Sequence, residues 1–381
     1  MNRFKAPYLY CALALILAGG HAAPISAAQP ESLSAKEFVS LISDFSEEGG
    51  FFFSDNFTSN EDSYLTIVDR MKELGASGGA YIGVGPEQNF TYIAKVRPRI
   101  AFIVDIRRQA MIQHLMYKAI FQLSPTRAHF LSCLLSRPMP AGKAPAANAP
   151  VDEILAFFAG IQADDKAFDR NLEAIRKTIQ QLGFPLSTQD QASLEYVYKS
   201  FRIWGFEVGF EPGTRFGRGG RFGRLPNLRQ LLAQKDLNGK QGNFLASTGD
   251  YDFVRGMHKK NLIIPIVGDF SGKKALASVG AYLRKRKINV SVFYLSNVEI
   301  VLLDWGSVDQ FSYFVNNVKK MPAGEQSLLI RSTFSWYGHP TRLPGYQLCT
   351  LLQKISVFLK DFDEGRYQSY QDLIMTHYIG P

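Results

Sequence analysis

Short apolar runs alternate with segments of helical spacing along most of the chain. These runs are bounded by glycine or polar residues, and most of them are too short to form a helix. Runs of this kind are typical of strands that are buried on both faces of a parallel sheet. Strands are expected at residues 79–85, 99–106, 242–247, 262–270, 288–299 and 327–334. Because helices separate them, the sequence predicts an α/β fold with a Rossmann-like, doubly wound, mainly parallel sheet.

Helices are expected before the first strand and in a long segment that interrupts the alternation. Ser34 and Glu37 have the spacing of a capping box, as do Ser187 and Asp190, and Gly75 is placed to end a second helix. Residues 155–183 and 187–201 have helical periodicity with no strand between them. They predict a helical insertion, or a lid over the sheet.

The predicted organisation has four parts. They are a signal peptide at 1–28, the N-terminal helices and the first half of the sheet at 29–135, a linker with the helical insertion and a Gly/Arg-rich loop at 136–225, and the second half of the sheet with a helical or irregular C-terminal tail at 226–381.

The first 28 residues have the pattern of an export signal. Arg3 and Lys5 precede an apolar run, and small residues that suit a signal peptidase follow it. The run is shorter than the roughly 20 residues that a membrane-spanning helix needs. The sequence therefore predicts export to the periplasm or the cell exterior, with an uncleaved anchor and a cytoplasmic location as the weaker alternatives.

Charge and composition narrow the range of partners. The formal net charge of +9 permits contact with acidic surfaces without requiring it. The Gly/Arg-rich run at 213–227 superficially resembles RNA-binding repeats, but one short run lacks a platform on which bases stack. A flexible cover for an active site is the preferred interpretation, and nucleic acid is not an expected partner.

Other residue types that often carry chemistry give weaker signals. Cys133 and Cys349 could pair in an exported protein or remain two buried thiols, and neither lies near a histidine in the sequence. The histidines have no ligand spacing such as HExxH, and no GxSxG motif is present. We therefore expect neither a metal site nor a hydrolase of that class.

Polar residues follow most of the predicted strands, where the ligand crevice of an open parallel sheet lies. In chain order they are Gly83, Gly85, Glu87 and Asn89, then Asp105, Arg107 and Arg108, then Ser247, Asp269 with Ser271, and Ser296 with Asn297. A polar loop at 54–61, SDNFTSNE, precedes the first strand. Its Asn56 could reach the amino-acid end of a cofactor, or its Asx side chains could hold the turns of the loop itself.

The two glycines and Asp105 form the strongest local signal. Gly83 and Gly85 let the backbone approach a ligand where a helix begins with free N–H groups. Asp105 lies about 20 residues further on, the offset at which an acidic side chain accepts hydrogen bonds from ribose hydroxyls. A dinucleotide fingerprint would have a third glycine where Gln88 stands. S-adenosylmethionine carries no phosphate, so the missing glycine favours it over a dinucleotide.

Several of these segments together resemble a known family. They are GVGPEQNFTYIAKVRPRIAFIVDIRRQ at 83–109, SDNFTSNE at 54–61 and PIVGDFSGKKALASVGAYLRKRKINVSVFYLSNVE at 265–299. The chain resembles, over about residues 35 to 340, an uncharacterised bacterial family whose fold is similar to that of class I S-adenosylmethionine-dependent methyltransferases. The resemblance implies that Gly83 and Gly85 lie against the cofactor and that Asp105 binds its ribose.

The chain departs from the methyltransferase pattern at two places. The acidic residue usual just before the glycines is absent, since Tyr81 and Ile82 stand there, and no Asn-Pro-Pro-Tyr-like sequence follows the fourth strand. Methylation of an amine in the usual way is therefore not implied. Asp269 occupies the corresponding place and is the candidate catalytic residue, to orient an acceptor or to act as a base.

Each candidate also has a structural interpretation. The glycines could serve strand-to-helix packing, Asp105 could pair with Arg107, and Asp269 could cap a helix. The leading hypothesis is a methyltransferase-like protein that binds S-adenosylmethionine as a small adenosyl ligand, with an unknown acceptor. The alternative is an exported binding or structural protein that keeps the fold without the reaction, and a nicotinamide oxidoreductase is a third possibility.

Overall fold

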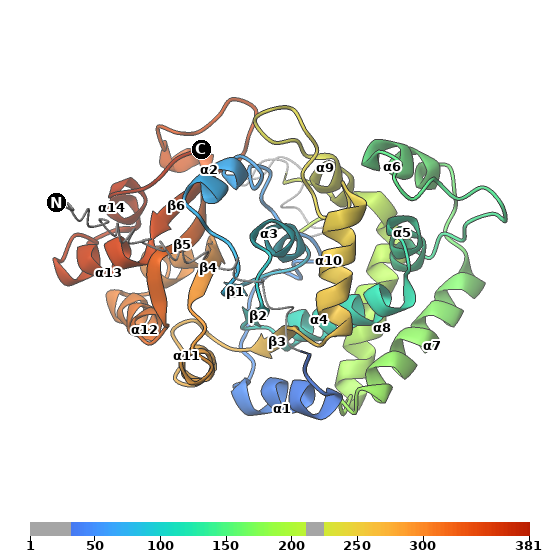
Figure 1. Ribbon diagram of the computed structural model, residues 1–381, viewed down its shortest axis with the longest axis horizontal. Helices are drawn as coiled ribbons and strands as arrows, with labels where there is room; N and C mark the ends of the chain where they lie inside the picture. Colours follow the sequence, from blue (N-terminus) through green and yellow to red (C-terminus); the bar gives the residue numbers. More distant parts are fainter. Residues whose placement is uncertain (1–31, 211–224) are drawn as a thin grey trace, which may run out of the picture.

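A six-stranded sheet forms the centre of the molecule in the computed structural model, which describes residues 32–210 and 225–381 (Figure 1). Its strands are β1 (Ala80–Gly83), β2 (Ile100–Asp105), β3 (Ile263–Val267), β4 (Val290–Ser296), β5 (Ala323–Phe334) and β6 (Leu348–Lys354). Their order across the sheet is β3-β2-β1-β4-β5-β6. The first five strands are parallel, and β6 runs antiparallel to β5. The predicted α/β fold with a mainly parallel sheet is confirmed.

Helices precede, separate and follow these strands. Their bounds are α1 (Ala35–Phe45), α2 (Val68–Glu73), α3 (Gln88–Val96), α4 (Arg108–Leu123), α5 (Arg127–Leu135), α6 (Val151–Ala159), α7 (Asp165–Gln181), α8 (Thr188–Trp204), α9 (Leu228–Ala233), α10 (Thr248–Lys259), α11 (Ala275–Lys285), α12 (Val308–Lys319), α13 (Ile355–Asp363) and α14 (Tyr370–Met375). The capping box predicted at Ser34 and Glu37 is confirmed at the start of α1. The one at Ser187 begins α8.

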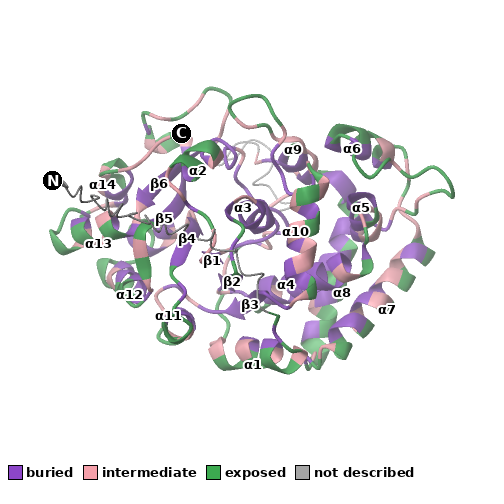
Figure 2. Ribbon diagram, in the orientation of Figure 1, coloured by how far each residue is buried: buried purple, intermediate pink, exposed green. Residues whose placement is uncertain are grey.

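Both faces of the sheet are covered by helices. On one face, the ring of Phe102 in β2 stacks on Phe45 of α1 and meets Tyr282 of α11 edge-on. On the other face, Tyr294 of β4 contacts the ring of Tyr92 in α3. Successive side chains of a strand point to opposite faces, so these contacts place the two helical layers on opposite sides. Figure 2 shows the strands as the buried centre, with exposed residues on the outer helices.

The segment between β2 and β3 is mainly helical and extends the molecule to one side of the sheet (Figure 1). Its α8 packs against α4 through the rings of Phe201 and Tyr117. The guanidinium of Arg108 at the start of α4 is 2.7 Å from the carboxylate of Asp190 in α8. No helix of the described residues is long and apolar enough to cross a membrane.

Two predicted elements differ from the structure. Residues 242–247 form turns instead of a strand, because the Asn243 side chain accepts a hydrogen bond from Leu245 N and so competes with extended pairing. The C-terminal tail contains β6, which was not predicted as a strand. The predictions for residues 1–28 and for the arginines at 215–224 lie outside the described residues.

Candidate ligand-binding site

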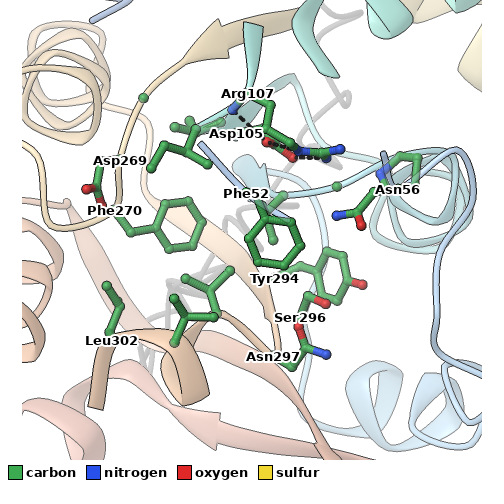
Figure 3. A pocket seen from close by; sticks show the side chains of 18 of the residues that line it. Phe52, Asn56, Asp105, Arg107, Asp269, Phe270, Tyr294, Ser296, Asn297 and Leu302 are labelled. Carbon is green, nitrogen blue, oxygen red and sulfur yellow. Dashed lines mark hydrogen bonds and ion pairs between the residues drawn. The ribbon is translucent and has the colours of Figure 1, made fainter. Parts of the chain in front are cut away.

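A cavity of about 220 Å³ lies at the edge of the sheet where the parallel strands end (Figure 3). Gly85 after β1, Asp105 at the end of β2, Asp269 after β3 and Ser296 at the end of β4 all line it. The chain winds from β1 outward to β2 and β3 and then returns to place β4 on the other side of β1. Such a reversal leaves a crevice beyond the strands. We call this space the carboxyl-edge cavity.

The two glycines of the first turn have different roles. Gly83 lies within β1, and a Cβ at this position would collide with the side-chain oxygen of Asn89, so this glycine serves packing. Gly85 lines the cavity with a φ of +77°, and a Cβ added there would meet no atom within 4 Å. Gly85 therefore opens the turn to the cavity in a conformation that favours glycine.

Asn89 holds this glycine turn from behind and does not line the cavity. Its Nδ2 donates to the carbonyl oxygens of Val84, Gly85 and Pro86 at 2.9, 3.0 and 2.8 Å, and its Oδ1 accepts from Tyr81. The Gly85 carbonyl also accepts from His114 Nε2 at 2.8 Å. Burial lowers the pKa of His114 to about 4, so its imidazole is neutral at pH 7. The turn is thus fixed without a ligand.

Asp105 lines the cavity and is also paired with Arg107. Its Oδ1 accepts from Arg107 N and Nε at 3.0 Å each, and its Oδ2 accepts from Nη2 at 2.9 Å. Two acceptor positions on Oδ1 are therefore filled, and one remains on Oδ2. The predicted pairing of Asp105 with Arg107 is confirmed, and the carboxylate still has room for one hydrogen bond from a ligand.

Arg107 ties the end of β2 to the polar loop at 54–61. Its guanidinium donates to the carbonyl oxygens of Ser54 and Asp55 at 3.2 and 2.5 Å. The loop is thereby held over the cavity, which Asn56, Thr58 and Asn60 line. Arg107 also lines the cavity, but its donors are used by protein acceptors.

Some polar atoms of this loop have no protein partner. The buried Asn56 Oδ1 and Thr58 Oγ1 accept or donate no hydrogen bond within the described residues. The side-chain amides of Asn60 and, across the cavity, Asn297 likewise have no such bond in the described part of the chain. In Figure 3 Asn56 lies beside the Asp105–Arg107 pair, with Phe52 and Tyr294 between it and Phe270. Buried polar groups without partners are uncommon in folded proteins, so Asn56 Oδ1 and Thr58 Oγ1 mark a place for a ligand or water.

Asp269 lies on the opposite margin of the cavity from Asn56 in Figure 3. Its Oδ1 accepts from Ser271 N and Oγ at 2.8 Å each. The helix that follows, α11, begins later, at Ala275, and its N-cap is Lys274. Asp269 is therefore not the N-cap of that helix, and its Oδ2 has no hydrogen bond among the described residues.

Besides Gly83 and Asn89, two further predicted binding residues lie away from the cavity. Ser247 is the N-cap of α10, where its hydroxyl accepts from Asp250 N. The strand expected before it is absent, so nothing brings it to the sheet edge. Glu87 is buried beside the loop, accepting from Ser59 N at 3.3 Å, and burial raises its pKa to about 7. The helices at 151–204 contribute no residue to the cavity and are not a lid over it.

Glu61 is a residue whose importance the sequence did not indicate. Its carboxylate is buried directly behind the cavity and accepts four hydrogen bonds. The donors and distances are Tyr294 Oη at 2.7 Å, Ser296 Oγ at 2.5 Å, Ser332 Oγ at 2.5 Å and Gln88 Nε2 at 3.0 Å. Gln88, which stands where a dinucleotide fingerprint has glycine, is thus part of this network. Glu61 belongs to the polar loop that the sequence singled out. Apart from Gln88, however, its hydrogen-bond partners are more than 200 residues away in the sequence.

A smaller apolar recess adjoins the carboxyl-edge cavity. Phe52, Asn60, Phe210, Asn297 and Val301 line both spaces. The recess continues between exposed aromatic side chains, of which Trp305 and Phe53 lie with ring centroids 6.2 Å apart. The site therefore has a polar part at the sheet edge and an apolar part beside it.

The two cysteines of the described residues, Cys133 and Cys349, are free. Cys349 is buried in β6, where burial raises the pKa of its thiol. Its Sγ is 3.8 Å from Nδ1 of His339, which lies ten residues away in the sequence. The raised pKa disfavours the thiolate, so this contact does not make a nucleophile. The described residues contain no cluster of three or more metal-ligating side chains.

A match to a protein family covers the strands of the sheet and most of the candidate site. A family described as a domain of unknown function (DUF7790) matches residues 56–141 and 218–378, which together exceed half of the chain. The chain belongs to this family. Its match includes Asn56, Glu61, Asp105 and Asp269, whereas the segment that it omits contains α6, α7 and α8. No curated protein matches the chain.

Proposed function

We propose that the chain binds S-adenosylmethionine, or a closely related adenosyl compound, in the carboxyl-edge cavity and is a methyltransferase-like protein with an unknown acceptor. One observation carries this proposal. The glycine turn at Gly85, the carboxylate of Asp105 and the unpartnered side chain of Asn56 converge on one cavity at the point where the strand order reverses. The proposal includes a Rossmann-like assignment of the fold, supported by the β3-β2-β1-β4-β5 order of parallel strands.

The residues of the cavity favour a nucleoside without phosphates. Carboxamides such as those of Asn56 and Asn60 donate and accept hydrogen bonds, as the edge of a nucleobase requires. Phe52 and Phe270 offer apolar faces against which a base can pack. Arg107 is the one cationic side chain among the described residues that line the cavity, and Asp105 holds it. A pyrophosphate would find no free cation among these described residues, which disfavours a nicotinamide dinucleotide.

Methyl transfer asks little of the protein beyond alignment of the methyl donor and the acceptor. Asp269 lies at the cavity margin with one carboxylate oxygen unbonded, so it could orient an acceptor or take its proton. The apolar recess between Val301 and Trp305 gives the acceptor a place beside the donor. S-adenosylmethionine supplies the electrophilic methyl group, and the protein aligns the acceptor and excludes water.

The alternative is an exported protein that binds a ligand in this cavity without transferring a group. The apolar run and basic residues of the first 28 positions favour it, because adenosyl cofactors are made in the cytoplasm. Fold alone does not confer the reaction. Cell fractionation separates the two cases, since a chain that is found outside the cytoplasm lacks access to the methyl donor.

Calorimetric titration of the purified chain with S-adenosylmethionine and S-adenosylhomocysteine tests the proposal. The informative variant is Asn56→Gly, because Asn56 has a φ of 47°, which glycine adopts freely, and its Oδ1 has no protein partner. We expect saturable binding that the variant weakens by about 1 to 1.5 kcal/mol, the net value of one hydrogen bond. Its free energy of unfolding should stay within about 0.5 kcal/mol of the wild type.

Asn238→Gly is the matched control. Asn238 lies on the surface, where its side chain bonds Asp69, away from the cavity. Unchanged affinity in this control and weaker binding in Asn56→Gly would support the site. No binding of either compound at millimolar concentration would refute the adenosyl assignment.

A further inference from the structure

The carboxylate of Glu61 is buried without a counter-ion among the described residues. Its four donors are neutral hydroxyl and amide groups, and no lysine, arginine or histidine of the described chain pairs with it. A carboxylate offers about four acceptor positions, so these donors match the ionised form. Burial raises the pKa of Glu61, and the four hydrogen bonds oppose that rise. A positive charge placed nearby would favour the ionised form further.

Two of the four donors form the wall of the carboxyl-edge cavity. Tyr294 and Ser296 each have a single O–H, and both donate it to Glu61, away from the cavity. Tyr294 Oη also accepts from Gln88 Nε2 at 3.2 Å, whereas no described donor fills the lone pairs of Ser296 Oγ, which remain for the ligand. Ser296 makes its contact with Glu61 from the left-handed region, with a φ of 53°, which is unfavourable for serine. Glu61 thus leaves Ser296 in the cavity wall as a hydrogen-bond acceptor.

The charged side chains of the described residues leave an excess of negative charge around the cavity. Arg107 and Asp105 neutralise each other, whereas Asp269 pairs with no cation among the described residues and Glu61 lies behind the wall. The rings of Phe52 and Phe270 also face the cavity in Figure 3, and aromatic faces attract cations. Negative charge, the lone pairs of Ser296 and aromatic faces all favour a ligand with a positive charge.

We propose that the carboxyl-edge cavity selects a ligand that carries a positive charge, of the sulfonium or quaternary ammonium class, and that Glu61 is the positioning residue for this preference. The adenosyl part of the ligand rests on the proposed function, but the selection of charge follows from the cavity itself. Glu61 acts through Tyr294 and Ser296 and does not touch the ligand.

Affinity for S-adenosylmethionine relative to S-adenosylhomocysteine measures this preference in the full chain. The two compounds share their adenosine and amino-acid groups, and the first has a sulfonium where the second has a neutral sulfur. We expect the wild type to bind the sulfonium compound about tenfold more tightly, and Glu61→Gln to bring the ratio of dissociation constants close to one. Because the ratio compares two ligands on one protein, a general loss of folded protein does not change it.

Asp62→Asn is the matched control, since Asp62 is the neighbouring carboxylate and accepts from the backbone of Gln347 and Leu348 instead. It should keep the wild-type ratio. Equal affinities in the wild type, or the same ratio in Glu61→Gln, would overturn the inference.

If neither adenosyl compound binds, the proposed function is refuted. The charge preference is then tested with a second probe. The trimethylsulfonium ion is then titrated, and its contact with the protein is followed by saturation-transfer NMR. A saturable signal in the wild type that is lost in Glu61→Gln supports the inference. The same signal in both proteins, or none in either, refutes it.

Discussion

Two neighbouring residues of β5 serve two buried glutamates on opposite faces of the sheet. Arg331 makes a two-pronged contact with Glu299, at 2.8 and 3.1 Å, on the face that α13 covers. Ser332 donates to Glu61 at 2.5 Å on the other face, behind the cavity. The first glutamate has a cation, and the second has neutral donors alone among the described residues. Two glutamate side chains therefore lie in two different electrostatic environments.

The difference separates a structural network from a candidate functional one. Around Arg331 the chain also supplies the side chain of Gln353 and the carbonyl of Leu373, so the buried charge is enclosed by acceptors. Around Glu61 the described part of the chain supplies no cation, and unpartnered polar atoms lie in the adjoining cavity wall. A network that is complete within the chain needs no ligand. A network that leaves a buried charge without a counter-ion has a place for a ligand.

Removing charge from the complete network should have the largest effect on stability. Glu299→Gln leaves the guanidinium of Arg331 buried without a charge partner, at 1 % side-chain exposure. We expect the free energy of unfolding to fall by about 3 to 5 kcal/mol, measured by urea denaturation. The double variant Glu299→Leu/Arg331→Met removes both charges and should recover most of this loss. A loss below about 1 kcal/mol in the single variant would remove the contrast between the two faces.

Glu87 gives a second, pH-dependent test beside the cavity. Burial raises its pKa from 4.5 to about 7, and one of its carboxylate oxygens has no partner among the described residues. Between those two values the unfolded chain loses this proton while the folded chain keeps it, so stability falls as pH rises. The shift corresponds to about 3 kcal/mol, fully lost above pH 7.

Glu87→Gln removes this titration and keeps the shape of the side chain. The variant should match the wild type near pH 4 and exceed its free energy of unfolding by up to about 3 kcal/mol at pH 8. Chemical denaturation at the two pH values measures the difference. A constant difference between variant and wild type would show that Glu87 does not titrate in this range.

The sequence predicted the features that depend on neighbouring residues. Apolar runs bounded by glycine or polar residues identify β1 to β4, because strands buried on both faces need no alternation. The caps at Ser34 and Ser187 are likewise local. Gly85 and Asp105 were found because each follows a predicted strand, and parallel topology brings such positions together.

Features that depend on distant contacts were not predictable in this way. Residues 242–247 have the composition of a strand, but the side chain of Asn243 turns the backbone there. Glu61 is an ordinary residue of a polar loop until the fold places Tyr294, Ser296 and Ser332 around it. The pairing of Asp105 with Arg107 was foreseen as an alternative to ligand binding, and the geometry allows both.

The smallest effect on stability is expected at Glu61, where the contrast with Glu299 is sharpest. In Glu61→Gln no cation is left without a partner. The new amide needs an acceptor, and Gln88 can supply one by turning its side chain, because its Oε1 has no partner among the described residues. The lost hydrogen bonds are further offset by removal of a buried charge. We expect a change in the free energy of unfolding of about 1 kcal/mol or less, measured by urea denaturation alongside Glu299→Gln. A loss as large as that of Glu299→Gln would mean that the ionised Glu61 holds the fold together. Charge selection would then no longer explain why a carboxylate is kept there.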